Sequence, residues 1–402
     1  MAVNLEAPSE LLPVAGVRVA AVEAGIRYKN RLDLALFELS EGSTVAGVYT
    51  LNAFCAAPVT VAKEHMAAPR AWLINSGNAN AGTGSRGLAD ARTSCDLVAQ
   101  ALDIPSDTVL PFSTGVISEF LNMDAFGPAI EEAGRKLSED AWTEAAQAIM
   151  TTDTVAKGIS RQREIGGVSI TMTGIAKGSG MIHPNMATML GFVATDAAVS
   201  STDLQACLRE ANEKSFNCVT VDGDTSTNDA CVLVATGKSG LHLGSSSPHW
   251  SEFCALVEEV MLHLAHALVR DGEGATKFIA LQVEGGRDRE ECKQLAFTVA
   301  HSPLVKTAFF ASDPNLGRVL AAIGRSGLDQ LDVSQIDVAL DEVTLVKSGN
   351  PAPDYTEARG KSVMLREEIT VRIELNRGNA SATVWTTDLS HDYVSINADY
   401  RS

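Results

Sequence analysis

The sequence predicts an α/β or α+β layered fold, in which sheets are covered by helices. Apolar residues recur at i, i+3, i+4 and i+7 in three segments, which indicates amphipathic helices. Short runs rich in β-forming residues are interleaved with these helices, and strict apolar–polar alternation follows near the C-terminus. Because both kinds of segment are half-apolar, each must bury one face against the other.

The expected helices differ in how clearly their ends are marked. The first covers 142–149 and follows Ser138, with two acidic residues suited to its first turn. The second covers 204–211. The third runs from about 248 to 270, and Gly272 lies just beyond its expected end.

The expected strands end in a C-terminal pair that predicts a β-hairpin. Residues 369–375 alternate apolar and polar, the turn Asn-Arg-Gly-Asn follows at 376–379, and alternation resumes at 380–384. A boundary near Gly285-Gly286, followed by a charged run, marks the expected start of a smaller C-terminal α+β domain. The other β-rich runs lie at 72–74, 167–173, 231–235, 278–283 and 336–346.

Composition limits the function classes. The 402 residues include 32 Lys and Arg against 50 Asp and Glu, a net charge of −18, which argues against nucleic acid or an anionic membrane as partner. No apolar run approaches the ~18 residues of a membrane span, and the N-terminus lacks a secretory signal pattern. The 7 cysteines are scattered without a C-x-x-C pair. We therefore expect a globular cytoplasmic protein with reduced cysteines.

Two motifs that could hold a cofactor are rejected. Residues 82–87 satisfy G-x-G-x-x-G, but the preceding apolar run ends at Ile74, too early to feed a dinucleotide-binding turn. His263 and His266 stand one helical turn apart, yet nothing nearby supplies further metal ligands in familiar spacing. The sequence therefore predicts no bound metal and no cofactor.

The most informative stretch is the glycine-rich segment 174–191. Its glycines and Pro184 describe a backbone held in unusual conformations, and the chain then turns apolar around Thr188. On composition alone, Thr188 is a strand residue after a flexible loop. A functional role for its hydroxyl requires a further argument.

That argument is a resemblance. The segment GIAKGSGMIHPNMATML resembles the cleavage region of the ornithine acetyltransferase (glutamate N-acetyltransferase) family of arginine biosynthesis, whose members cut themselves at an Ala–Thr bond. Gly82, Ser118 and Leu316 depart from the family pattern. Further similar motifs, in chain order, are VAGVYT at 45–50, AAPV at 56–59, NSGNANA at 75–81, STGVI at 113–117, IMTTDT at 149–154, SFNCVTVDGDTSTND at 215–229, VRDGEGATKF at 269–278, SDPNLGR at 312–318 and the terminal YVSINADYRS.

The resemblance implies an architecture. It implies a layered sandwich of β-sheets flanked by helices, and self-cleavage between Ala187 and Thr188. Residues 1–187 would then form an alpha chain and 188–402 a beta chain. Within the beta chain, 188–285 would complete the catalytic sandwich and 286–402 would form a C-terminal domain that closes the substrate site. Two alpha and two beta chains would assemble together.

The resemblance also assigns the catalytic groups. Within an intact chain, Thr188 has no adjacent base, but attack of its hydroxyl on the Ala187 carbonyl would lead to cleavage and free its α-amine. That amine has a reference pKa of about 7.7 to 8.0, so it can act as base for its own hydroxyl. By resemblance, the Thr114 hydroxyl and the Gly115 backbone N–H form the oxyanion hole.

Substrate contacts are implied in the same way. A cation such as Lys177 suits an amino-acid carboxylate, and Glu273 suits an ammonium group. The expected reaction is ping-pong transfer of the acetyl group from N2-acetyl-L-ornithine to L-glutamate. The implied substrate-binding residues are Thr154, Lys177, Thr188, Glu273, Asn397 and Ser402.

Three alternatives stay open at this point. Some family members also accept acetyl-CoA as the acetyl donor. An N-terminal-nucleophile amidase or aminopeptidase of related fold would use water in place of glutamate. A binding protein without activity is favoured only if the chain never cleaves.

Overall fold

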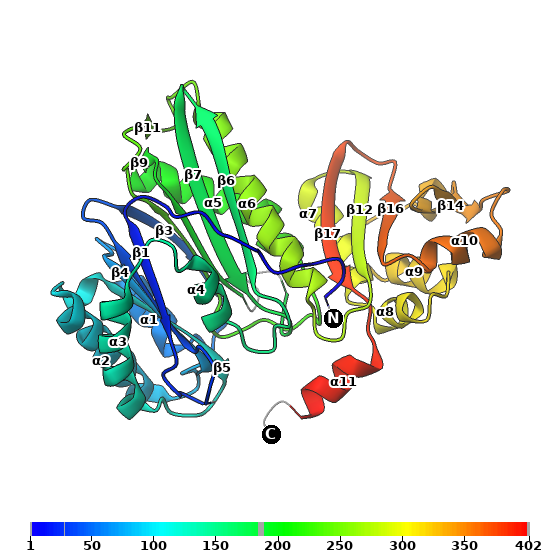
Figure 1. Ribbon diagram of the computed structural model, residues 1–402. Helices are drawn as coiled ribbons and strands as arrows, with labels where there is room; N and C mark the ends of the chain where they lie inside the picture. Colours follow the sequence, from blue (N-terminus) through cyan, green and yellow to red (C-terminus); the bar gives the residue numbers. More distant parts are fainter. Residues whose placement is uncertain (1, 28, 184–188, 400–402) are drawn as a thin grey trace.

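The computed structural model describes residues 2–27, 29–183 and 189–399 (Figure 1). A four-stranded sheet has the order β1-β2-β4-β5, and a five-stranded sheet has the order β3-β10-β8-β7-β6. Together they make the larger, N-terminal part of the molecule. Their strands are β1 (Val17–Val22), β2 (Leu34–Leu39), β3 (Thr44–Tyr49), β4 (Ala71–Asn78), β5 (Val109–Val116), β6 (Lys157–Ile165), β7 (Val168–Lys177), β8 (Leu190–Thr195) and β10 (Ala230–Ala235).

These two sheets pack face to face through aromatic side chains. Phe37 on β2 stacks on Phe192 of β8 with ring centroids 5.9 Å apart, and Phe112 of β5 meets the same ring edge-on at 5.1 Å. All three side chains are buried. Contacts of this kind favour offset or edge-to-face geometry and remove large apolar areas from water. The expected sandwich of β-sheets is therefore confirmed.

Helices cover the outer face of each sheet. The four-stranded sheet packs against one group of helices, and the five-stranded sheet packs against α5 and α6. Strands covered on both faces read as nearly continuous apolar runs, as β8 and β10 do. The helices of this part are α1 (Ala57–Glu64), α2 (Gly84–Leu102), α3 (Met123–Lys136), α4 (Trp142–Ala148), α5 (Ser201–Lys214) and α6 (Trp250–Arg270).

The C-terminal part has a core of its own. Its six-stranded sheet has the order β15-β14-β13-β16-β12-β17 and packs against helices, to the right of α6 in Figure 1. The elements are β12 (Phe278–Gly286), α7 (Arg289–Ala300), α8 (Pro303–Phe310), α9 (Leu316–Gly324), β13 (Asp337–Leu340), β14 (Val343–Lys347), β15 (Asn350–Pro351), α10 (Glu357–Met364), β16 (Glu368–Glu374) and β17 (Ala380–Thr387), followed by α11 (His391–Ala398). A short pair, β9 (Ala198–Val199) and β11 (His242–Leu243), lies in the N-terminal part.

The predicted C-terminal hairpin is wrong in its pairing. Both strands exist, but β12 lies between them, parallel to β16 and antiparallel to β17. The expected turn at 376–379 instead passes the end of β12. There the Leu375 N–H donates to Glu284 O at 2.9 Å, and the Arg377 N–H donates to Gly285 O at 2.8 Å. Since β12 belongs to this sheet, the sheet begins at Phe278, before the expected boundary at 285–286.

The three expected helices are confirmed as α4, α5 and α6. The first begins at Trp142 as expected, but Ser138 forms a β-bridge with Val19, so Glu139 and Asp140 lie before the helix and not in its first turn. The expected β-rich runs at 72–74, 231–235 and 278–283 lie within β4, β10 and β12, the run at 167–173 overlaps β7, and the run at 336–346 covers β13, a turn and most of β14. Of the helices in the described ranges, none combines the length and the apolar character that a membrane span requires.

Candidate active site

Five of the residues expected to carry the chemistry line one cavity. It is lined by Thr114 and Gly115 of β5, Lys177 at the end of β7, Glu273 after α6 and Asn397 on α11. The contributing elements come from both sheets and from the C-terminal helix. The predicted residues Ala187, Thr188 and Ser402 lie outside the described residues.

Lys177 sets the hydrogen-bonding role of Thr114. The Lys177 Nζ donates to Thr114 Oγ1 at 3.1 Å and to Thr151 Oγ1 at 2.7 Å. Because Thr114 Oγ1 accepts this bond, the hydroxyl proton of Thr114 is directed to another acceptor. Burial lowers the pKa of Lys177, and the negative charge of Asp153 opposes this shift. The Thr114 hydroxyl therefore keeps its proton for a bond other than the one with Lys177.

Gly115 occupies a position that only glycine fits. Its φ of +132° lies in a region that side chains disfavour, and a Cβ there would come within 2.3 Å of the Gly77 carbonyl carbon on β4. The chain therefore passes Gly77 closely at the end of the parallel β4–β5 pair. This close approach lets a backbone group, in place of a side chain, form part of the cavity wall.

Glu273 joins the C-terminal helix to the cavity. Its N–H donates to Ser179 O at 2.8 Å, and its Oε2 accepts from Asn397 Nδ2 at 2.7 Å. A Cβ at Gly180 would lie 2.4 Å from the Glu273 Cδ, so glycine makes room for this carboxyl group. Glu273 is therefore held at the cavity through its backbone by Ser179 and through its carboxylate by Asn397, which connects α11 to the site.

Thr154 lies in a neighbouring groove, away from the Thr114–Lys177 contact. Its N–H donates to Asp271 Oδ2 at 2.9 Å, and its hydroxyl donates a hydrogen bond to Asp271 Oδ1. The groove also includes Glu273. Lys177, Glu273 and Asn397 line the cavity described above. Of the predicted binding residues that the structure describes, Thr154 alone does not line it.

A buried ion cluster, which sequence reasoning missed, lies next to Lys177 and the residue that follows it. Lys157 Nζ lies 2.6 Å from both Asp153 Oδ1 and Asp271 Oδ2, and the three side chains are at most 1% exposed. Burial alone would raise the pKa of Asp153, but the charges of Lys157 and Lys177 hold it well below its usual range. Asp153 Oδ1 also accepts from the Gly178 N–H at 2.7 Å. The cluster therefore fixes the backbone directly after Lys177.

Asp229 is a second residue that sequence reasoning missed. Its Oδ1 accepts from the Met189 N–H at 2.9 Å, so it fixes the residue that follows Thr188 in the chain. The side chain is fully buried, and burial raises its pKa well above the ordinary value. The only indication of this role in the sequence is that Asp229 is the last residue of the family-like motif SFNCVTVDGDTSTND.

Potential metal ligands are not grouped in the described ranges. No three His, Cys, Asp or Glu side chains lie together there in a way that could hold a metal ion.

The part of the chain that contains these site residues is similar to known proteins. A sequence model of the ArgJ family matches residues 18–402. The arginine biosynthesis bifunctional protein ArgJ of Methylococcus capsulatus is 57% identical over 394 residues, which are 98% of this chain and 97% of that protein. The structure of argJ from Bacillus halodurans is 36% identical with a TM-score of 0.50 and covers 52% of this chain and 97% of that chain. Ornithine acetyltransferase complexed with ornithine, from Mycobacterium tuberculosis, is 35% identical with a TM-score of 0.38 and covers 43% of this chain and 92% of that chain.

Proposed function

Because this chain belongs to the ArgJ family and is an acetyltransferase of arginine biosynthesis, we propose that it transfers the acetyl group of N2-acetyl-L-ornithine to L-glutamate through Thr188. The family resemblance drawn from the sequence motifs is confirmed. The observation that carries the proposal is the single cavity where Thr114, Gly115, Lys177 and Glu273 meet. It offers oxyanion donors, a cation and an anion around one cavity.

Self-cleavage between Ala187 and Thr188 supplies the nucleophile in this proposal. It divides the chain into an alpha chain, 1–187, and a beta chain, 188–402, two of each in the assembly. In support, the Bacillus halodurans chain covers about half of this chain although nearly all of its own length is matched. The C-terminal domain of the beta chain then begins at β12 and closes the substrate site through Asn397.

The first half-reaction forms an acetyl ester on Thr188. The freed α-amine takes the proton of the Thr188 hydroxyl as its oxygen attacks the acetyl carbonyl. The Thr114 hydroxyl and the Gly115 N–H donate to the oxyanion of the tetrahedral intermediate. Collapse breaks the bond between the acetyl carbon and the ornithine nitrogen, and the α-amine returns its proton to that nitrogen.

The second half-reaction reverses these steps with glutamate. The glutamate amine attacks the acetyl ester, the same two donors hold the oxyanion, and Thr188 leaves with its proton restored. The mechanism uses no metal or other cofactor. Acetyl-CoA is a further acetyl donor compatible with the same ester intermediate.

Substrate binding divides by charge in this proposal. Lys177 supplies a cation for the α-carboxylate, and Glu273 supplies an anion for the δ-ammonium group of ornithine. Asn397 orients the Glu273 carboxylate through the 2.7 Å bond described above. Thr154 and Ser402 are proposed as further contacts.

Glutamate dependence tests the proposal against the amidase alternative. With acetylornithine alone, the enzyme should release about one ornithine per site and then stop, because the acetyl ester waits for an amine acceptor. Addition of glutamate should restore continuous release together with formation of N-acetylglutamate. Both products can be followed by chromatography. Continuous release at the same rate in water alone would establish the amidase instead.

Loss of one oxyanion donor gives a second prediction. Thr114→Val removes the hydroxyl with little change in volume, and kcat should fall about 100- to 1000-fold. The KM for acetylornithine should change little, because the donor acts mainly on the transition state. Steady-state kinetics measures both constants on fully cleaved protein.

Thr114→Ser is the matched control, since it keeps the hydroxyl that accepts from Lys177. Its kcat should remain within about tenfold of the wild type. Equal losses in the two variants would show that packing at this position, rather than hydrogen-bond donation, is what matters.

A further inference from the structure

The segment 181–183, which leads to the proposed cleavage bond, is fixed through its backbone. The carboxylate of Asp222 accepts from the Met181 N–H at 2.6 Å and from the Ile182 N–H at 2.9 Å. Met181 has a φ of +54°, in the left-handed region that residues with a side chain seldom adopt. Asp222 therefore stabilises a bend in the chain at this point.

The carbonyl side of the same segment is held by the residues just before Asp222. The Ile182 oxygen accepts from the Thr220 hydroxyl at 2.8 Å and from the Val221 N–H at 2.9 Å. The Thr220 N–H in turn donates to the Trp385 oxygen on β17 at 2.9 Å. The segment is thus connected, through Thr220, to the sheet of the C-terminal part.

His301, which directly follows α7, makes a second connection to the C-terminal part. Its Nε2 lies 2.9 Å from His183 Nδ1 and 2.9 Å from Thr220 Oγ1. The His301 ring stacks on Phe297 of α7 with ring centroids 5.5 Å apart, and α7 packs against β12 and β17. The C-terminal part therefore determines where this ring lies.

One proton satisfies both contacts of His301. The Thr220 hydroxyl donates to the Ile182 oxygen, so its own oxygen is left to accept from the His301 Nε2–H. His183 Nδ1 accepts from the same N–H. Burial lowers the pKa of both rings, to about 3 for His301, so both are neutral at neutral pH. The geometry thus requires a donor at Nε2 of His301 and an acceptor at Nδ1 of His183.

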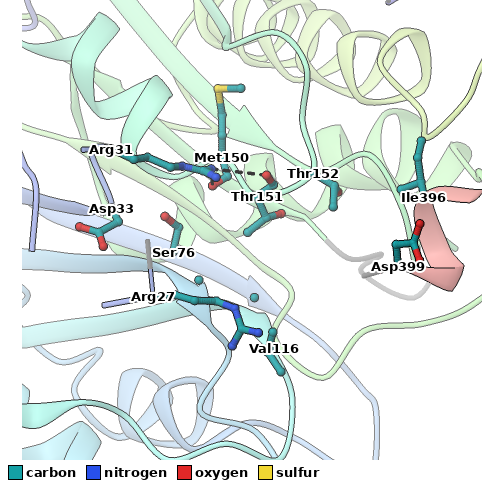
Figure 2. A pocket seen from close by; sticks show the side chains of 12 residues that line it. Arg27, Arg31, Asp33, Ser76, Val116, Met150, Thr151, Thr152, Ile396 and Asp399 are labelled. Carbon is teal, nitrogen blue, oxygen red and sulfur yellow. Dashed lines mark hydrogen bonds between the residues drawn. The ribbon is translucent and has the colours of Figure 1, made fainter. Parts of the chain in front are cut away.

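Helix α11 adds a third contact from the C-terminal part. The Tyr393 hydroxyl donates to Asp222 Oδ2 at 3.2 Å, and the same carboxylate holds the segment 181–183. Asn397 on this helix lines the main cavity, and Figure 2 shows Ile396 and Asp399 beside a second cavity that adjoins it. The contacts that fix the segment and those that complete the cavity therefore come from one folded part.

Self-cleavage depends on the placement of the backbone on both sides of the bond. The Thr188 hydroxyl oxygen must approach the Ala187 carbonyl carbon closely and in the correct direction, and a misplacement of about 1 Å can cost about 100-fold in rate. After the bond, Asp229 fixes the Met189 N–H, as described above. Before the bond, the contacts of the segment 181–183 are the corresponding restraint.

We propose that His301 is a positioning residue for self-cleavage: through His183 and Thr220 it holds the segment that precedes the cleavage bond. This inference rests on the proposed function. The chemical step needs no group from His301. The Thr188 oxygen bonds to the Ala187 carbonyl carbon, the C–N bond breaks, the proton moves from that oxygen to the nitrogen, and water hydrolyses the ester. Since His301 belongs to the C-terminal part, the chain is cut only after that part has folded.

The test measures the rate of self-cleavage while the full-length chain is synthesised in a cell-free system, with samples taken over time under denaturing conditions. His301→Leu removes the donor at Nε2, and the rate constant of cleavage should fall about 10- to 100-fold. His301→Gln places an amide N–H close to the position of Nε2, so it should restore most of the rate. A purely steric role would not distinguish the two variants in this way.

Variants of His183 test the same contact from the other side. His183→Leu removes the acceptor and should also slow cleavage, whereas His183→Asn offers an amide oxygen near the position of Nδ1 and should restore most of the rate. The double variant His183→Leu/His301→Leu should cleave no more slowly than His301→Leu, because the contact is already lost.

His266→Leu is the matched control. This histidine lies at the junction between α6 and the C-terminal part, with its ring centroid 5.4 Å from that of Phe278 and 4.4 Å from that of Trp385. The variant should cleave at the wild-type rate. Once it has been cleaved, His301→Leu should transfer the acetyl group with the kcat and KM of the wild type, because His301 does not line the cavity.

The assignment fails in any of three cases. Cleavage of folded His301→Leu or His183→Leu at the wild-type rate would show that their contact does not position the bond. Equal slowing in His301→Leu and His266→Leu would assign the effect to packing at the junction. A kcat of cleaved His301→Leu that falls by the same factor as its cleavage rate would mean that His301 does not act on self-cleavage specifically. A wild type that stays uncleaved would instead refute the proposed function.

Discussion

Replacing Thr188 with alanine is expected to leave a single uncleaved chain of 402 residues with no acetyltransferase activity. In the proposed mechanism the hydroxyl attacks the Ala187 carbonyl, and without it neither the ester nor the free α-amine can form. The wild type should separate under denaturing conditions into residues 1–187 and 188–402. Intact mass spectrometry of both proteins measures this directly.

Thr188→Ser is the control for this prediction, because it retains a hydroxyl and, after cleavage, an α-amine. It should cleave and keep measurable transfer activity. The alanine variant should still fold, since its two halves are already joined and the sandwich core is unchanged. Cleavage that persists in Thr188→Ala would mean that another group cuts the chain, and Thr188 would lose its proposed role.

The sequence predicted local structure better than strand pairing. The helix at α6 follows from a repeat within its own residues, so its extent could be predicted closely. The β16–β17 pairing failed because a hairpin signal reports only on adjacent residues. It contains no information about β12, which precedes β16 by many residues and pairs with β16 along one backbone edge and with β17 along the other.

For the site, too, the sequence identified individual residues better than it predicted which residues lie together. Lys177, Thr114 and Glu273 were identified by motif resemblance, but their meeting depends on strand ends from different sheets, which no local pattern encodes. In the motifs MTTDT and RDGEG, nothing distinguishes Asp153 and Asp271 from ordinary polar residues. Only the fold shows that both bind one buried lysine.

Replacing that lysine should cause the largest loss of stability. In Lys157→Met, the carboxylates of Asp153 and Asp271 would remain buried without the Nζ that lies 2.6 Å from each. Removal of one member of a buried ion pair typically costs about 3 to 5 kcal/mol, because the remaining charge stays out of water. The free energy of unfolding, measured by urea denaturation of uncleaved Thr188→Ala protein, should fall by that amount. The Thr188→Ala background keeps the measurement on one chain.

Two further variants on the same background distinguish charge from packing. Adding Asp153→Asn and Asp271→Asn to Lys157→Met removes the uncompensated charges and should recover part of the lost stability. Arg92→Met breaks an exposed ion pair, Arg92–Glu64, whose side chains are 52% and 48% exposed, and should cost less than about 1 kcal/mol. A triple variant no more stable than Lys157→Met would assign the loss to the packing of the lysine side chain. An Arg92→Met loss equal to that of Lys157→Met would show that burial does not decide the strength of these ion pairs.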